Sequence, residues 1–280
     1  MSVIQQTNKN KPSTDDLKMV QSYELEIMKY IHQFCEQNHL RYSLAYGTAI
    51  GAVRHHGFIP WDDDIDIVMP REDYNRFLTL WKNSDDYILV NKDTNPDFTQ
   101  NFTKIKKNHT TFLQEEDVGK SYHKGIFVDI FPADRIPHQT LAQQKFYLCC
   151  LLSLLFTRNH NSGKGGLVQK VENALLSLSE NSKRTLLLRA NQNIQKYNSH
   201  KDYRYIFLST LQSCTMVYPS NIFSEIVLTD FENEEFYIFK QVDLHLKIVY
   251  GNYMQLPPEE DRVWKHHPIM IDFAHNYEEI

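Results

Sequence analysis

The segment from Trp61 to Met69 places four aspartates directly before a run of apolar residues, in the sequence WDDDIDIVM. From Asp64 onward acidic and apolar residues alternate, and successive side chains of a β-strand point to opposite faces of its sheet. A strand that begins here carries Asp64 and Asp66 on one face. Two carboxylates on one face repel each other, and oxygen ligands of this kind favour Mg²⁺, Mn²⁺ or Ca²⁺ over zinc. The segment therefore predicts a metal site at the start of a strand.

A glycine turn precedes this acidic segment. A short strand expected over residues 40–45 leads to Gly47, which permits an unusual backbone turn, and to Thr48, which can cap a helix over residues 49–55. The N-terminal amides of that helix would suit an anion.

Two later strands carry charged residues that matter for the site. The expected strand over residues 125–132 is almost wholly apolar apart from Asp129, and a lone acid in a buried strand is costly unless it is paired or bound to a metal. The expected strand over residues 102–106 carries Lys104 and Lys106 on one face.

The hydrophobic periodicity predicts helices and strands in alternation through the first half of the chain. Ser13 and Asp16 resemble a capping box at the start of the first helix. Helices are expected over 14–37, 71–81 and 241–250, and further strands over 87–90, 110–113, 215–218, 226–230 and 235–238. The fold class is α/β (α+β): a mixed sheet flanked by helices.

Residues 138–200 predict a helical insertion, with a hinge between two helices at 163–166. The apolar run over 146–156 is much shorter than the roughly 20 residues that span a bilayer, and a buried core helix is favoured over a surface that touches a lipid-linked substrate. The expected organisation is a catalytic core over 1–137, the insertion over 138–200, and strands, a helix and a tail over 201–280 that complete the core.

The net charge of the chain limits its possible partners, and its cysteines indicate the cellular compartment. A net charge of −5 and a pI near 6.2 give no global footprint for nucleic acid. The four cysteines have no Cys-x-x-Cys spacing, and no signal or transit pattern is found at the N-terminus, so a reduced cytoplasm is expected.

Together, Gly47 with Thr48, the pair Asp64 and Asp66, and Asp129 on a later strand resemble the nucleotidyltransferase superfamily. Carboxylates in this arrangement can hold one or two Mg²⁺ ions, which would bridge phosphate oxygens and lower the pKa of an attacking hydroxyl. A nucleotidyltransferase-type sheet is therefore expected.

A closer resemblance is to the LicD family, which includes bacterial phosphocholine transferases and is related to the fukutin group of phosphoribitol transferases. Its successive motifs are matched by YGTAIGAVR over 46–54, GFIPWDDDIDI over 57–67, GIFVDIFP over 125–132 and YGNYMQLPP over 250–258. Asn252 stands where many members carry an acid, and it is not counted as a ligand.

The resemblance implies transfer of phosphocholine from CDP-choline to a sugar hydroxyl of a cell-surface glycan, a teichoic acid precursor or a lipopolysaccharide, with release of CMP. Asp64, Asp66 and Asp129 carry over as catalytic residues and as ligands of Mg²⁺ or Mn²⁺. Asp129 binds a second ion or accepts the proton of the acceptor. A lipid-linked acceptor would bring the protein to the inner face of the cytoplasmic membrane.

Further residues are expected around the substrate. The glycine turn at Gly47 and Thr48 is expected to hold a phosphate through backbone amides. The candidates for phosphate or pyrophosphate contacts are Arg54, Lys104 and Lys106, with Arg262 and His267 near the phosphates. The main role expected of Trp61 is packing. Its second expected role is to stack on cytosine or to face the choline ammonium.

Each of these assignments has an alternative. Asp62 and Asp63 are expected to order the loop, and the basic residues can form a solvated face. The alternative activities are a phosphoribitol-type transferase and a nucleotidyltransferase, and the alternative outside enzymes is a divalent-ion-binding scaffold.

Overall fold

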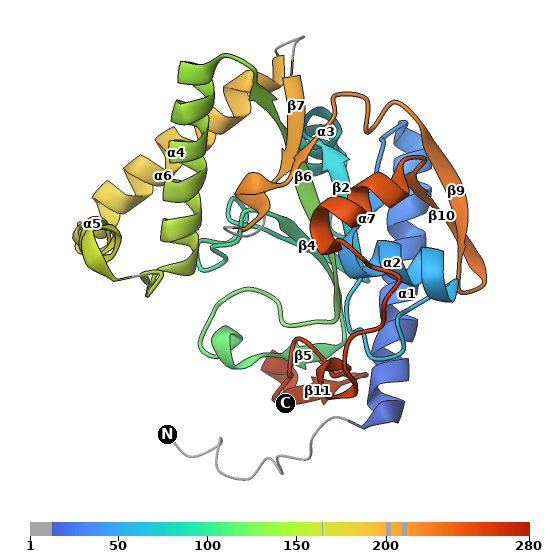
Figure 1. Ribbon diagram of the computed structural model, residues 1–280. Helices are drawn as coiled ribbons and strands as arrows, with labels where there is room; N and C mark the ends of the chain where they lie inside the picture. Colours follow the sequence, from blue (N-terminus) through green and yellow to red (C-terminus); the bar gives the residue numbers. More distant parts are fainter. Residues whose placement is uncertain (1–12, 164, 200–202, 209–211) are drawn as a thin grey trace.

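The protein is described by a computed structural model that covers all residues except 1–12, 164, 200–202 and 209–211. In Figure 1 the central strands stand between the long helix α1 and a separate layer formed by helices α4 and α6. The helices are α1 (Thr14–Asn38), α2 (Tyr46–His55), α3 (Arg71–Leu80), α4 (Thr140–Arg158), α5 (Gly166–Leu176), α6 (Glu180–Gln195) and α7 (Val242–Tyr250).

The main sheet mixes parallel and antiparallel pairs. Its strands are β1 (Ser43–Leu44), β2 (Asp66–Pro70), β3 (Tyr87–Val90), β4 (Thr103–Lys107), β6 (Phe127–Pro137), β7 (Tyr203–Phe207) and β8 (Val217–Tyr218). The order is β1-β2-β6-β4-β3, with β2 and β6 parallel. The 11-residue strand β6 pairs with β4 along its first part and with β7 along its second part, and β8 extends β7. The predicted α/β class is confirmed.

Two small antiparallel pairs complete the strands. A hairpin is formed by β9 (Ile226–Phe231) and β10 (Glu234–Phe239), and β5 (Thr111–Leu113) pairs with β11 (Met270–Asp272). The second pair joins the C-terminal tail to the first half of the chain, so residues near 266 lie close to the acidic segment although about 200 residues separate them in the sequence.

One face of the sheet is covered by α1 and α3. The capping box predicted at Ser13 and Asp16 is present, and α1 then runs with its apolar side toward the strands. Ile67, Ile105 and Ile130 are fully buried in one cluster with residues of α1 and α3. Because side chains alternate along a strand, Asp66, Lys104 and Asp129 belong to the opposite face.

The helical insertion differs in detail from the prediction. Three helices follow one another rather than two, because Ser179 starts α6 by accepting a hydrogen bond from the Ser182 amide. Of the predicted hinge, Lys164 lies outside the described residues. The apolar run over 146–156 is mostly buried, as predicted, against β6, β7 and α6. The three-part division of the chain stays a prediction.

Two strands were not predicted, and the strands expected over 40–45 and 215–218 are shorter than expected. The missed strands β7 and β11 each pair with a segment far away in the sequence, which local periodicity does not encode. The strand expected over 40–45 is reduced to β1 because α2 begins at Tyr46.

Gly51 in α2 provides a test of how tightly the segment before the acids is packed. A Cβ added at Gly51 would stand 2.4 Å from the carbonyl oxygen of Gly57, a backbone atom that cannot move aside alone. We expect Gly51→Ala to lower the free energy of unfolding by about 1–3 kcal/mol in urea denaturation, as overpacked cores do. Ser22→Ala, at an exposed position of α1, is the control and should change it by less than about 0.5 kcal/mol. An unchanged midpoint for Gly51→Ala would contradict this packing.

Candidate active site

Three strands bring the central charged residues side by side. Asp66 on β2 is in register with Asp129 on β6, and Asp129 is in register with Lys104 on β4. The Lys104 Nζ lies 2.7 and 2.8 Å from the two carboxylate oxygens of Asp129 and 3.3 Å from the centre of the Phe127 ring. All three charged side chains are buried or nearly so. The face of the sheet opposite α1 thus holds an acid pair with one lysine bound to Asp129.

Helix α2 fixes the start of β2. The amide of Asp66 donates to the Thr48 hydroxyl at 2.8 Å, and the amide of Ala45 donates to the Asp66 carbonyl at 2.9 Å. The predicted cap at Thr48 is wrong: α2 begins at Tyr46, so Thr48 lies inside the first turn and its hydroxyl holds Asp66 instead. Thr48 therefore contacts the start of β2 instead of capping α2.

The role predicted for Gly47 in the turn also needs correction. The positive φ, 47°, belongs to Tyr46, whose amide donates to Nε2 of His245 at 3.2 Å. Gly47 is helical, and a Cβ at this position would stand 2.6 Å from Oδ2 of Asp62. The absence of a side chain at Gly47 thus lets the Asp62 carboxylate approach the first turn of α2, and the chain does not turn at this glycine.

The four aspartates do not form one strand. β2 begins at Asp66, so Asp64 precedes it, and the predicted alternation along a strand from Asp64 is wrong. Asp62, Asp63 and Asp64 instead lie together, each with one carboxylate oxygen within 4.8 Å of the others. The irregular segment before β2 therefore brings three carboxylates together, of which only Asp64 was predicted to be a ligand.

Asp63 orders the loop, as predicted. Its carboxylate is fully buried and accepts hydrogen bonds from the backbone amides of Lys265 and His266 at 3.1 and 3.0 Å. These bonds and the His266 ring lower the pKa of Asp63 although burial acts to raise it. Asp63 thus ties the C-terminal tail to the acidic segment.

The other acids have few partners. Among the described residues the carboxylates of Asp62 and Asp66 accept no hydrogen bond, and Asp64 has only the His266 ring at 3.9 Å. Burial first, and then the neighbouring acids, raise the pKa of Asp62 to about 8 and that of Asp66 well above its usual value. Burial also raises the pKa of Asp64, to about 6. A set of crowded carboxylate oxygens without donors fits a hard divalent cation.

Glu24 is a buried acid that the sequence reasoning missed. It lies on α1 with 1% of its surface exposed, and its Oε2 has no hydrogen-bond partner among the described residues. Burial, followed by the charges of Asp64 and Asp63, raises its pKa well above the usual range. Gln21, one turn earlier, donates to the Asp62 carbonyl at 2.8 Å. The only sequence signal was an acid among the inward-facing positions of an amphipathic helix.

His266 is a second missed residue. Its Nδ1 lies 3.3 Å from Asp63, and although burial alone would lower its pKa, the hydrogen bond to Asp63 and the charge of Asp64 raise it. The predicted residue, His267, is exposed and has a φ of 42°. The structure therefore brings the first histidine of the pair to the acids and turns the second outward.

A group of positive charge borders the acids near Trp61. The guanidinium carbon of Arg262 lies 5.5 Å from the centre of the Trp61 ring, and the Arg54 Nη1 donates to the Tyr253 carbonyl at 2.7 Å. Burial and then the charge of Arg262 lower the pKa of Arg54. Within the described part of the chain neither arginine has a carboxylate partner at ion-pair distance. The Trp61 ring also faces His55, at 6.4 Å between ring centres.

Lys106 lies beyond Lys104 on the same strand face. It is 2% exposed, and its single hydrogen bond in the described residues is a long one, 3.4 Å, to the Gly125 carbonyl. Burial and the charge of Lys104 lower its pKa to about 7. The two lysines that the sequence paired are brought together, but only Lys104 reaches an acid.

A polar cavity of about 330 Å³ lies elsewhere, next to α3 and the segment before β4. Its lining includes Arg71, Tyr74, Lys92 and Phe102, and none of the residues predicted for the site. The acids and arginines described above, and not this cavity, therefore define the candidate site.

The raised acid pKa values give a pH dependence of stability for the metal-free protein. Groups whose pKa is raised by folding stabilise the native state at low pH and lose that contribution as the pH rises through the folded value. Glu24, Asp62, Asp64, Asp66 and His266 all have raised pKa values and act in this direction. Lys106, whose pKa is lowered to about 7, acts in the opposite direction above that pH and offsets part of the effect. We expect the urea midpoint in EDTA to rise as the pH falls from about 8.5 to about 6. A midpoint that rises with pH over this window would contradict the clustering.

The fold and site together define a class: a mixed sheet in which carboxylates of adjacent strands meet beside a helix start, as in nucleotidyltransferase domains. The family profile described as "LicD/FKTN/FKRP, nucleotidyltransferase domain" matches residues 39–147. The chain is 31% identical over 246 residues to the lipopolysaccharide cholinephosphotransferase LicD of Haemophilus influenzae, covering 85% of this chain and 91% of that protein. The chain belongs to the LicD family.

Two shorter matches are to uncharacterized proteins of Rickettsia. That of Rickettsia typhi is 44% identical over 52 residues, 19% of this chain and 17% of that protein. That of Rickettsia prowazekii is 46% identical over 48 residues, 17% of this chain and 18% of that protein. Among the described residues no helix is both long and apolar enough to cross a membrane.

Proposed function

We propose that this protein transfers phosphocholine from CDP-choline to a sugar hydroxyl of a cell-surface glycan. The observation that carries the proposal is the group of acids formed by buried Asp66 and Asp129 and half-buried Asp62 and Asp64, bordered by Arg54 and Arg262 without carboxylate partners. Such a site suits a ligand that brings both a divalent cation and phosphate oxygens. The relative in Haemophilus influenzae is a lipopolysaccharide cholinephosphotransferase, which supports the choice of transferred group.

In the proposed reaction the acceptor hydroxyl attacks the phosphorus that carries choline. A new P–O bond forms to the sugar, the P–O bond of the diphosphate to the CMP portion breaks, and CMP leaves. The hydroxyl proton passes to a base of the site. Asp129 is the candidate base, as the alternative to its role as a metal ligand, and the contact with Lys104 holds both of its oxygens in place on β6.

We propose Mg²⁺ or Mn²⁺ as the cofactor, held by Asp64, Asp66 and Asp129 with Asp62 beside them. When bound, the ion would neutralise charge on the phosphate oxygens. The protein's own contribution is to fix the acids through Thr48 and the strand register, and to supply positive charge from Arg54, Arg262, Lys104 and Lys106 to the diphosphate. The aromatic ring of Trp61 is proposed to stack on the cytosine or to face the choline ammonium.

The acceptor is proposed to be a lipopolysaccharide sugar or a teichoic acid precursor, reached from the cytoplasmic side and lipid-linked when modified. A phosphoribitol transferase and a nucleotidyltransferase use the same acids but attach a different fragment. A scaffold that binds a divalent ion without catalysis would have no need for two arginines and a buried lysine that lack carboxylate partners among the described residues.

The test is to incubate the full chain and Mg²⁺ with CDP-choline or CDP-ribitol and glycan acceptors of both kinds, and to weigh the modified acceptor by mass spectrometry. Addition of phosphocholine with release of CMP is the expected result. Addition of phosphoribitol or of a nucleotide would replace the proposal with one of its alternatives, and the absence of any product with either donor would favour the scaffold.

A further inference from the structure

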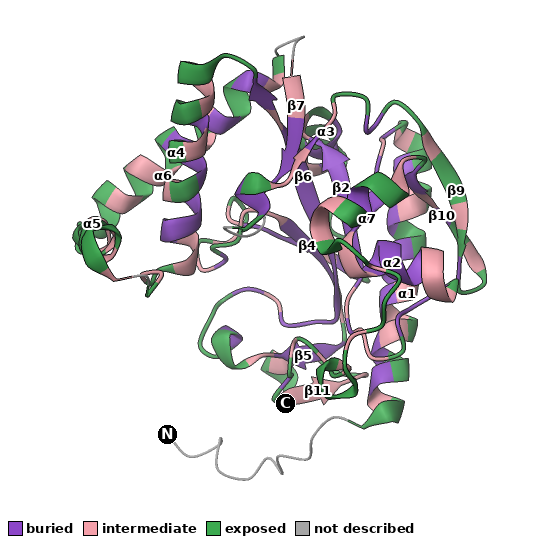
Figure 2. Ribbon diagram, viewed as in Figure 1, coloured by how far each residue is buried: buried purple, intermediate pink, exposed green. Residues whose placement is uncertain are grey.

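Helix α5 exposes an apolar face that no described part of the chain covers. None of its residues is buried, and Leu167, Val168 and Val171 are 77%, 53% and 50% exposed. These residues lie at positions i, i+1 and i+4, which fall on one side of a helix. Figure 2 shows α5 at the edge of the molecule, beyond α4 and α6 and away from the main sheet. An amphipathic helix normally buries such a face, so something outside this part of the chain is needed to cover it.

The two neighbouring helices show the same excess of exposed apolar residues. Each is well packed on its inner side, where Phe146 and Cys150 of α4 and Ala190 and Ile194 of α6 are buried in one cluster. On the outer side, further exposed apolar residues are Leu141, Leu148, Leu151 and Leu188. The insertion therefore buries its inner side against the sheet and still presents leucines to the outside.

The charge of the insertion is opposite to that of the whole chain. Residues 138–200 contain eight Lys and Arg and two Asp and Glu, a net charge of +6, whereas the chain as a whole carries −5, so the rest carries −11. Both acids are paired, Glu172 with Arg158 and Glu180 with Lys183. Exposed basic residues without a carboxylate partner among the described residues are Lys145, Lys170, Arg184 and Arg189. The insertion that carries the exposed apolar face thus also carries exposed basic residues.

We propose that the outer surface of this insertion docks on a membrane rich in anionic lipids, with Leu167, Val168 and Val171 entering the interface and the basic residues facing the headgroups. A basic helix with an apolar face lies in a lipid interface in this way, and each nearby Lys or Arg strengthens binding to anionic lipid. The proposal rests on exposure and charge, and it does not depend on the acidic site. If the proposed acceptor is lipid-linked, this surface would hold the enzyme where the acceptor is.

A second copy of the chain is a less suitable occupant. A two-fold interface would place the same patch of both copies face to face, and here each patch belongs to an insertion whose net charge is +6. Like charges brought together across an interface oppose association, whereas anionic headgroups neutralise them. The charge of the patch therefore selects lipid over self-association.

The experiment is sedimentation of the full chain with vesicles of phosphatidylcholine alone or with one quarter phosphatidylglycerol. We expect binding only to the vesicles that contain phosphatidylglycerol, and weaker binding as salt rises, because salt screens the attraction. The variant Lys170→Gln/Arg184→Gln/Arg189→Gln should bind these vesicles about a hundredfold more weakly. The variant Leu167→Ser/Val168→Ser/Val171→Ser should bind them at least about tenfold more weakly.

Matched changes elsewhere serve as controls. Val227→Ser/Leu228→Ser alters exposed apolar residues of β9, and Lys18→Gln/Lys82→Gln/Lys120→Gln removes three exposed charges outside the insertion. Both control variants should bind vesicles like the wild type. For the wild type alone, hydrogen exchange over 166–171 should slow when anionic vesicles are added.

Several outcomes would overturn the proposal. These are equal sedimentation of the wild type with both vesicle types, no sedimentation with either, and unchanged binding by the two patch variants. A wild-type dimer in analytical ultracentrifugation that the patch variants abolish, without any vesicle binding, would assign the surface to a second copy.

Discussion

Asp66→Asn is expected to leave the protein folded and to reduce phosphocholine transfer by at least about 10³-fold, since a metal ion that stabilises transition-state charge contributes several kcal/mol. Asp66 is buried, its amide is held by Thr48, and no donor among the described residues offsets its carboxylate. The amide side chain keeps the size of aspartate and removes the charge that a cation requires. Transfer is measured as CMP release with saturating donor and acceptor.

The same variant should be as stable as the wild type, or more stable, in urea with EDTA. Burial and then Asp64 and Asp129 raise the pKa of Asp66, so the wild-type site is strained by repulsion when no cation is present. Asp85→Asn, which changes an exposed acid in the loop before β3, is the matched control and should alter neither transfer nor stability. Near-normal turnover by Asp66→Asn would remove this strand from the catalytic centre.

Lys104→Met is expected to have the opposite effect on stability. The ammonium group is within 2.8 Å of both Asp129 oxygens in a buried setting, and its removal leaves Asp129 uncompensated beside Asp66. Breaking one partner of a buried ion pair costs about 3–5 kcal/mol, which urea denaturation in EDTA would register as a large fall of the midpoint.

The double variant Lys104→Met/Asp129→Asn separates the pair from the packing of the lysine chain. Because the uncompensated charge is gone, the double variant should regain most of the stability that Lys104→Met loses. If the double variant were as unstable as Lys104→Met, the loss would come from the packing of Lys104 on Phe127 and not from the charge of Asp129.

Much of the framework could be predicted because its signals are local. The capping box of α1, the helix over Arg71–Leu80 and the strand at Tyr87–Val90 depend on nearby residues, and each is present as expected. The resemblance to nucleotidyltransferases implied that Asp66 and Asp129 share one site, and the register of β2 and β6 places the two residues side by side.

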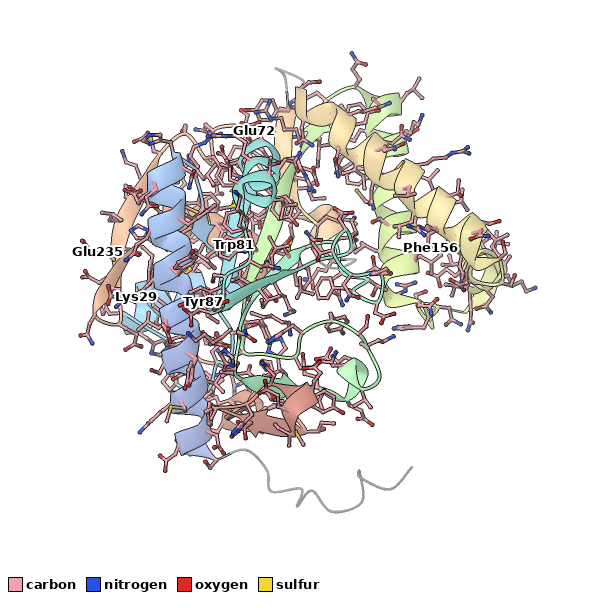
Figure 3. All side chains as sticks on the ribbon, turned by 180° about the vertical axis from the view of Figure 1, so that it is seen from behind. Lys29, Glu72, Trp81, Tyr87, Phe156 and Glu235 are labelled. Carbon is pink, nitrogen blue, oxygen red and sulfur yellow. The ribbon has the colours of Figure 1, made fainter. Side chains whose placement is uncertain are left out.

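The details that were missed depend on contacts between distant segments. Thr48 was expected to cap a helix, but its hydroxyl is taken by Asp66, 18 residues later. His266 reaches Asp63 because β11 pairs with β5, and neither short strand has a periodicity strong enough to place the tail. Glu24 was hidden in a helix whose other inward residues are apolar, and only the packed structure shows that its nearest charges are the acids of the site. Figure 3, which shows the side chains from behind, also places labelled Trp81 and Tyr87 beside α1, on the side of the sheet that α1 covers.

The measurement that tests the central claim most directly is the dependence of phosphocholine transfer on a divalent cation. The full chain is treated with EDTA, and CMP release from CDP-choline is followed with glycan acceptor while Mg²⁺ or Mn²⁺ is added back, for the wild type and for Asp66→Asn. The structure predicts no transfer in EDTA, recovery with either ion in the wild type, and no recovery in Asp66→Asn. Full turnover in EDTA, or equal recovery by both proteins, would contradict a cation site built on these carboxylates.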